Sequence, residues 1–108
     1  MKKGDIYFIN IDDHKGSEQG GFRPVLILKE VVGSVVVALM TTKKKKKLPV
    51  HIDIHKEYTG LEKDSVVLLE QIQILNKDKF TKIKPATYLV DSAKWREIEQ
   101  GLRVSLGL

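Results

Sequence analysis

Apolar runs separated by polar or glycine-containing segments constrain the fold of this chain more than any other feature. Their lengths and their content of valine and isoleucine are typical of β-strands. The expected strands span 6–11, 25–28, 35–40, 48–55 and 65–75. A single helix is expected from Asp91 or Ser92, both good N-cap residues, to about Leu106. We therefore predict a mainly β fold with a C-terminal α-helix: a small, curled antiparallel barrel forming one domain over 1–108.

The expected helix carries one apolar stripe. Its members are three or four residues apart: Trp95, Ile98, Leu102 and Leu106. Trp95 is therefore interpreted as a core residue rather than a base-stacking platform. Gly101 lies within the same helix and weakens it by roughly 1 kcal/mol relative to alanine. Two shorter segments are assigned as one helical turn and a connector, at 76–79 and 85–90.

Three of the expected strands are apolar on both faces. A simple antiparallel sheet exposes one face to water, and a single helix covers only part of the other. A further surface should therefore be buried, most simply in a homodimer. In the fourth strand, Pro49 indicates a short strand or one at a sheet edge. The alternation there places His51 and His55 on an exposed face, and no cluster of residues has metal-ligand spacing.

The net charge of +5 comes from one segment. Without the five lysines at 43–47 the chain is neutral. Such a run is either a solvated loop or a patch that attracts nucleic acid through its phosphates. The chain has no cysteine, and no apolar stretch approaches the roughly 20 residues that span a bilayer. The N-terminus lacks the apolar region of a signal peptide, so we expect a cytoplasmic protein with no membrane partner.

The segment 16–24 places an arginine after a glycine-rich loop. Pro24 favours extended geometry at Arg23, so Arg23 is expected at the mouth of a strand, with Glu18 in the loop before it. A guanidinium beside such a loop suits a phosphate or carboxylate ligand. The alternative is a solvated arginine that only begins a strand.

Two further polar features lie at strand positions. In the strand 65–75, Glu70 shares a face with four aliphatic side chains if the strand is regular. A carboxylate there needs a partner, for which Arg23 is a candidate, or a bulge after Leu69 turns it to water. Thr41 and Thr42 end the third strand, where their hydroxyls either hold a phosphate oxygen or are ordinary strand residues.

Three segments carry a family resemblance: Lys-Gly-Asp-Ile-Tyr-Phe at 3–8, Gly-Ser-Glu-Gln-Gly-Gly-Phe-Arg-Pro-Val-Leu at 16–26, and Lys-Asp-Ser-Val-Val-Leu-Leu-Glu-Gln-Ile at 63–72. In this order and spacing, the chain resembles the MazF/PemK toxins of bacterial type II toxin–antitoxin systems, most closely the Gram-positive members. The resemblance implies an SH3-like barrel and a homodimer. It also implies an endoribonuclease that needs no metal or cofactor and cuts single-stranded RNA at short motifs.

The resemblance also implies roles for individual residues. The catalytic candidates are Arg23, Thr41, Glu18 and Glu70. The candidates for RNA contact are Ser17, Gln19, Phe22, Thr42, Lys43, Lys44, Gln71 and Gln73. Ser17 stands where some members have a histidine, so an acid/base role of that histidine is absent here, and Gln73 stands where many have an arginine, which changes the expected RNA contacts. The lysine run at 43–47 replaces a more mixed loop that borders the RNA groove in such folds, so the base preference does not carry over.

The expected mechanism uses the nucleophile of the RNA itself. The 2′-OH attacks the adjacent phosphorus and leaves a 2′,3′-cyclic phosphate and a 5′-OH end. Arg23 would stabilise the charge on the phosphorane, Thr41 would hold a non-bridging oxygen, and Glu18 or Glu70 would accept the proton. The resemblance further implies an acidic antitoxin, with DNA contacted only through it. The alternatives are a CcdB-like toxin that binds DNA gyrase and a small RNA-binding barrel without activity.

Overall fold

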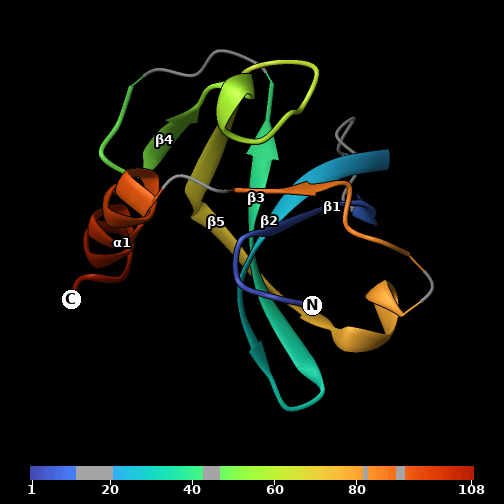
Figure 1. The fold of residues 1–108 in the computed structure, drawn as a ribbon. Helices are drawn as coiled ribbons and strands as arrows, with labels where there is room; N and C mark the ends of the chain where they lie inside the picture. The colour runs from blue at the N-terminus through green and yellow to red at the C-terminus, as the bar shows by residue number, and fades with distance from the viewer. Residues whose placement is uncertain (12–20, 43–46, 82, 90–91) are drawn as a thin grey trace.

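The computed structural model spans residues 1–108 and describes residues 1–11, 21–42, 47–81, 83–89 and 92–108. This described part contains six strands and one α-helix (Figure 1). The strands are β1 (Asp5–Ile11), β2 (Gly21–Val31), β3 (Ser34–Thr41), β4 (His51–Ile54), β5 (Ser65–Asn76) and β6 (Thr87–Tyr88). The helix α1 spans Ser92–Leu106, and two 3₁₀ turns span Lys56–Tyr58 (η1) and Lys77–Phe80 (η2).

The strands form one curled antiparallel sheet in the order β4-β5-β3-β2-β1-β6. Helix α1 packs against β4 and β5, far from the β2–β3 hairpin turn (Figure 1). The predicted fold class is therefore confirmed, and so are the helical turn after β5 and the short edge strand near Pro49. The segment 85–90 is more than a connector, because β6 lies within it. A strand of two residues is too short to leave a periodic signal in the sequence.

Strand β2 begins earlier than predicted. Arg23 is its third residue and pairs with Ile9 of β1. Within the described residues, β2 pairs with β1 back to Gly21, but its pairs with β3 begin only at Val25. The first part of β2 therefore has a single neighbouring strand, and this position accommodates Pro24 without a lost ladder bond. At this end of the sheet, β2 and β3 separate.

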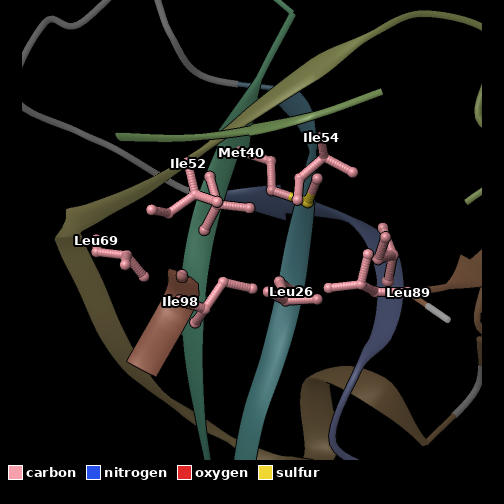
Figure 2. Close-up of a cluster of buried hydrophobic side chains, with 10 residues drawn as sticks. Leu26, Met40, Ile52, Ile54, Leu69, Leu89 and Ile98 are labelled. Atoms are coloured by element: carbon pink, nitrogen blue, oxygen red, sulfur yellow. The ribbon is translucent and has the colours of Figure 1, made fainter. Parts of the chain in front are cut away.

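One hydrophobic cluster joins α1 to the sheet. Members of this cluster come from the strands, from α1 and from the segment before α1. Figure 2 labels Leu26, Met40, Ile52, Ile54, Leu69, Leu89 and Ile98. Trp95 and Leu102 pack against this cluster, which confirms the core assignment of Trp95. Leu106 is exposed, so the buried stripe ends one turn before the helix does.

Gly101 lies where the helix approaches the sheet closely. A Cβ atom at this position would lie 2.5 Å from Leu69 Cδ1 and 3.2 Å from the carbonyl oxygen of Pro49. The loss of helix propensity at glycine is thus offset by contact between α1 and the strands. The Ser105 hydroxyl adds a hydrogen bond of 2.7 Å to the carbonyl oxygen of Leu69.

A second cluster fills the opposite face of β1, β2 and β3. Its members are Tyr7, Ile9, Ile11, Val25, Ile27, Val35, Val37, Leu39 and Phe80. Phe80, from η2, meets the Tyr7 ring edge-on at 5.1 Å between centroids. The strands that are apolar on both faces are therefore buried on both faces within one chain, because the sheet curls. The homodimer is not needed to explain them and stays a prediction.

Candidate functional site

Arg23 lies where β2 and β3 separate. Its Nη2 donates a hydrogen bond of 3.4 Å to the backbone carbonyl oxygen of Met40. A guanidinium carries five N–H donors. Most of the donors of Arg23 therefore have no acceptor among the described protein groups. The side chain is partly buried and anchored on one side, and its remaining donors suit a phosphate.

Thr41 lies at the same end of the sheet. It is the last residue of β3 and faces Val66 of β5. Arg23 and Thr41 each lie two residues beyond the last β2–β3 pair, Val25–Leu39. The structure thus brings the predicted arginine and threonine to neighbouring strand ends. This arrangement can hold a phosphate between a guanidinium and a hydroxyl.

Glu70 occupies a bulge in β5. Ala38 of β3 pairs with Ile72 and the next residue, Leu39, pairs with Leu68, so 69–71 have no partner in β3. The bulge alternative is therefore the one observed. The Glu70 carboxylate contacts His51 Nε2 at 2.7 Å, and Arg23 donates to the Met40 carbonyl oxygen instead. His51, and not Arg23, is therefore the partner of Glu70 that the structure shows. Glu70 also lies four residues along β5 from Val66, away from Thr41.

The placement of His51 differs from the sequence-based expectation. Its side chain is only 7% exposed, whereas the Glu70 side chain beside it is 40% exposed. His51 is the first residue of β4 and pairs with Leu68, next to the bulge, and its Nε2 meets the Glu70 carboxylate from the bulge. Simple alternation cannot reveal this contact, because the alternation assumes a regular neighbouring strand. His55 is exposed, as predicted.

The two glutamines of β5 have different settings. Gln71 lies exposed in the bulge, beside Glu70. Gln73 lies past the bulge, half-buried and opposite Val37. Thr41 pairs with Val66, and both glutamines lie further from Val66 along β5 than Glu70 does. Their roles in RNA contact stay predictions.

Phe22 is 74% exposed, so a core role within this chain is excluded. Phe8 of β1, which the sequence analysis did not single out, is 44% exposed on the same face of the sheet. The only signal for Phe8 was its place in an apolar strand, which is shared with buried neighbours. Phe8 pairs with Pro24, which lies in the part of β2 that has no described partner in β3.

Two hollows meet at Thr42. One, called here the aromatic groove, has a volume of about 540 Å³ and is lined by Phe8, Phe22, Pro24, Thr42, Gly60, Leu61, Glu62, Lys63 and Ser65. The other, called here the acidic hollow, has a volume of about 270 Å³ and contains Asp53 and Asp64. The Lys56 backbone N–H donates to the Asp64 carboxylate at 2.8 Å, and this hydrogen bond lowers the pKa of Asp64. Asp64 is therefore anionic near neutral pH and repels phosphate.

Five predicted site residues lie outside the described residues: Glu18, Ser17, Gln19, Lys43 and Lys44. Among the residues that the structure describes, no group of three or more His, Cys, Asp or Glu side chains could hold a metal ion. In the same part of the chain, no helix is long and apolar enough to cross a membrane.

Residues 2–106 match the family described as the PemK-like, MazF-like toxins of type II toxin–antitoxin systems. The chain belongs to this toxin family. It is 41% identical over 114 residues to a Staphylococcus saprophyticus protein named endoribonuclease MazF, and the match covers 100% of this chain and 92% of that protein. The expected family resemblance is thereby confirmed.

Solved structures of MazF toxins share the fold of this toxin. The Deinococcus radiodurans MazF superposes with a TM-score of 0.77 at 22% identity, over 100% of this chain and 97% of that one. The Mycobacterium tuberculosis toxin MazF-mt6 superposes with a TM-score of 0.75 at 22% identity, over 96% and 97% of the two chains. The curled sheet with a C-terminal helix is thus the MazF fold.

Proposed function

We propose that this toxin is a metal-independent, sequence-specific endoribonuclease that cuts single-stranded RNA and acts in the cytoplasm. The observation that carries the proposal is the placement of Arg23 beside the strand end that holds Thr41. Arg23 is anchored to Met40, and most of its donors have no acceptor among the residues that the structure describes. The name of the staphylococcal relative, endoribonuclease MazF, supports the activity. Single-stranded substrate suits this geometry, because in-line attack requires a splayed backbone.

The reaction needs no reagent beyond the RNA and a proton carrier. The 2′-OH loses its proton and forms a bond to phosphorus, while the bond from phosphorus to the 5′ oxygen breaks and that oxygen gains a proton. Arg23 holds the equatorial oxygens of the phosphorane as charge builds on them, and the Thr41 hydroxyl donates to one of them. A guanidinium does not give up its proton in proteins, so Arg23 is a stabiliser rather than an acid.

The proton acceptor in this proposal is one of two carboxylates, Glu18 or Glu70. The Glu70 carboxylate is hydrogen-bonded to a buried imidazole and lies along β5 from Val66, the residue that faces Thr41. Glu18 precedes Arg23 by five residues in the chain. Because the Glu70 carboxylate is already bonded to His51, the proposal takes Glu18 as the base, with Glu70 holding the β5 bulge in shape.

The proposal includes partners of the same kind as those of the relatives. Solved structures similar to this chain include MazE–MazF from Deinococcus radiodurans and a mycobacterial endoribonuclease in complex with its cognate antitoxin. We expect this toxin to form a homodimer and to bind an acidic antitoxin that blocks RNA, with DNA contacted only through the antitoxin. The basic segment 43–47 would attract an acidic tail and RNA alike. Failure of a cognate acidic peptide to protect RNA would contradict this.

The test is incubation of the purified toxin with a long single-stranded RNA in excess EDTA, followed by sequencing of the product ends. Discrete cuts with 5′-OH ends, lost in Arg23→Ala, are expected. Arg96→Ala is the matched control, because Arg96 is an exposed arginine on α1. A folded wild-type protein that leaves the RNA intact would contradict the proposal and favour the gyrase-binding or RNA-binding alternative.

A further inference from the structure

Two phenylalanines form an exposed aromatic ridge beside Arg23. In the register of β1 and β2, Phe8 pairs with Pro24 and Asn10 pairs with Phe22. Phe8 and Phe22 are thus diagonal neighbours on one face, at a separation of roughly 7–8 Å that aromatic side chains can bridge. Of the three phenylalanines in the chain, only Phe80 is buried. The ridge therefore places two large apolar side chains in water at a single location.

The ridge separates two hollows. The aromatic groove lies on one side, and a second hollow of about 240 Å³ lies on the other, lined by Phe8, Ile9, Asn10, Phe22, Lys79 and Ile83. Phe8 and Phe22 thus line both hollows, and each hollow also has one lysine, Lys63 or Lys79. Exposed aromatic faces with cations at the margin are the usual platform for nucleobases in single-stranded binding sites.

The charges distinguish a base from a phosphate as the ligand of the aromatic groove. Lys63 and Glu62 both line the groove, so its charged side chains cancel. An uncharged, flat ligand suits this lining better than a phosphate does. The acidic hollow on the other side of Thr42 contains Asp53 and Asp64 and disfavours the passage of a phosphate backbone.

The strand geometry connects the ridge to the reaction site. Phe22 and Arg23 are consecutive in β2, so their side chains point to opposite faces. Strand β3 does not pair with β2 here, so the edge of β2 between the two faces is open in the described structure. A nucleotide that crosses this edge can place its phosphate at Arg23 and its base on Phe22.

We infer that Phe8, Phe22 and the aromatic groove bind a nucleobase next to the scissile phosphate by stacking, and that Phe8 is a further RNA-binding residue of this toxin. The inference rests on the proposed function, because the scissile phosphate is placed at Arg23. In this inference, the aromatic ridge binds a base of the substrate, while Arg23 and Thr41 bind the phosphate that reacts.

The test measures the affinity for a mixed-sequence oligonucleotide whose 2′-O-methyl groups prevent cleavage, by fluorescence anisotropy at a fixed salt concentration. Phe8→Leu and Phe22→Leu should each raise Kd by about five- to twentyfold, because leucine keeps apolar bulk but cannot stack. Tyr88→Leu is the matched control, since Tyr88 is an exposed aromatic residue of β6 outside both hollows, and its Kd should change less than twofold. The thermal midpoints of all three variants should match the wild type.

An abasic strand separates stacking from charge. On a sugar-phosphate chain without bases, the phenylalanine variants should bind as the wild type does, whereas Arg23→Gln should weaken binding to both strands and reduce the salt dependence by about one unit of slope. The inference is overturned if the phenylalanine variants match Tyr88→Leu on the strand with bases, or lose equal affinity on both strands. That result would leave the groove to an apolar segment of a protein partner.

Cleavage of unmodified RNA in parallel keeps the two proposals distinguishable. If the wild type cuts RNA and the phenylalanine variants bind normally, the stacking inference fails while the nuclease proposal stands. If the wild type does not cut but binding depends on the two phenylalanines, the nuclease proposal fails while the base site stands. A wild type that neither binds nor cuts contradicts both.

Discussion

Arg23 and Glu70 are two charged residues of one sheet in opposite situations. Arg23 lies where β2 and β3 separate, and its Nη2 donates one long hydrogen bond, of 3.4 Å, to the carbonyl oxygen of Met40. Glu70 lies in the β5 bulge, and its carboxylate meets the buried imidazole of His51 at 2.7 Å. Within the described part of the chain, the arginine has donors left for a ligand, while the glutamate has a close protein partner.

The difference indicates how the site is built. A charged group that is anchored but incompletely bonded is suited to a ligand, because binding needs no broken protein contact. A carboxylate already bonded to a buried side chain stabilises local structure, and its use as a base would compete with that bond. We therefore expect the two residues to differ in their effect on cleavage.

The largest effect should come from Arg23→Lys. This change keeps the positive charge and removes the planar fork that matches a phosphate. The single-turnover rate constant should fall by about 100-fold, the size expected for loss of a main charge stabiliser. Arg96→Lys on α1 is the control and should change the rate less than twofold. A lysine variant within a few-fold of the wild type would show that only charge is needed.

Thr41→Val should have the next largest effect. It is nearly isosteric and removes the hydroxyl proposed to donate to a phosphorane oxygen, so the rate constant at saturating RNA should fall by about tenfold. Thr81→Val is the matched control, because Thr81 is an exposed threonine at the end of η2, outside the site. Thr81→Val should lower the rate less than threefold, and equal losses in the two variants would contradict the assigned role of Thr41.

Glu70→Gln should lower the rate constant by less than tenfold. A general base would cost about 100- to 10,000-fold, so the assay separates the two roles. His51→Gln should give a similar small loss, and the double variant should lose little more, because both changes remove the same contact. A large loss in Glu70→Gln with an unaffected His51→Gln would assign Glu70 to the chemistry.

The smallest effect on cleavage is expected for Glu30→Gln. This variant breaks an ion pair, Glu30–Lys77, that has a structural role only. Glu30 meets Lys77 Nζ at 2.6 Å, and this hydrogen bond holds the pKa of Glu30 below its ordinary value. The carboxylate therefore stabilises the fold above its unfolded-state pKa, and this stability is lost as the pH falls through the lower folded-state value.

Cleavage by Glu30→Gln should equal that of the wild type at neutral pH. The variant's free energy of unfolding, measured by urea denaturation, should fall less than the wild type's between about pH 5 and pH 3. Equal acid sensitivity in the two proteins would show that the Glu30–Lys77 pair does not stabilise the fold.

Much of this architecture could be predicted from local sequence patterns. Valine and isoleucine runs indicate the long strands, and the stripe of Trp95, Ile98 and Leu102 indicates the buried side of α1. Pro24 indicates extended geometry at Arg23, and the structure places Arg23 in β2. These features depend on neighbours in the chain or on simple alternation, and both can be read from residue order.

The remaining features depend on register between distant strands. The bulge at 69–71 puts Glu70 on His51, and no pattern within β5 fixes where β3 and β4 pair with it. The setting of Phe8 also depends on register, since Phe8 pairs with Pro24, in the part of β2 that has no described partner in β3. Gly101 was predicted only as a weak point of the helix, because its close contact with Leu69 arises from tertiary packing.

The most direct test of the difference between the two charged residues is a comparison of single-turnover cleavage by Arg23→Ala and Glu70→Gln on one RNA in excess EDTA. We predict that Arg23→Ala is at least about 100-fold slower than the wild type, while Glu70→Gln stays within tenfold of it. The reverse order, with Arg23→Ala nearly active and Glu70→Gln inactive, would contradict the proposed site.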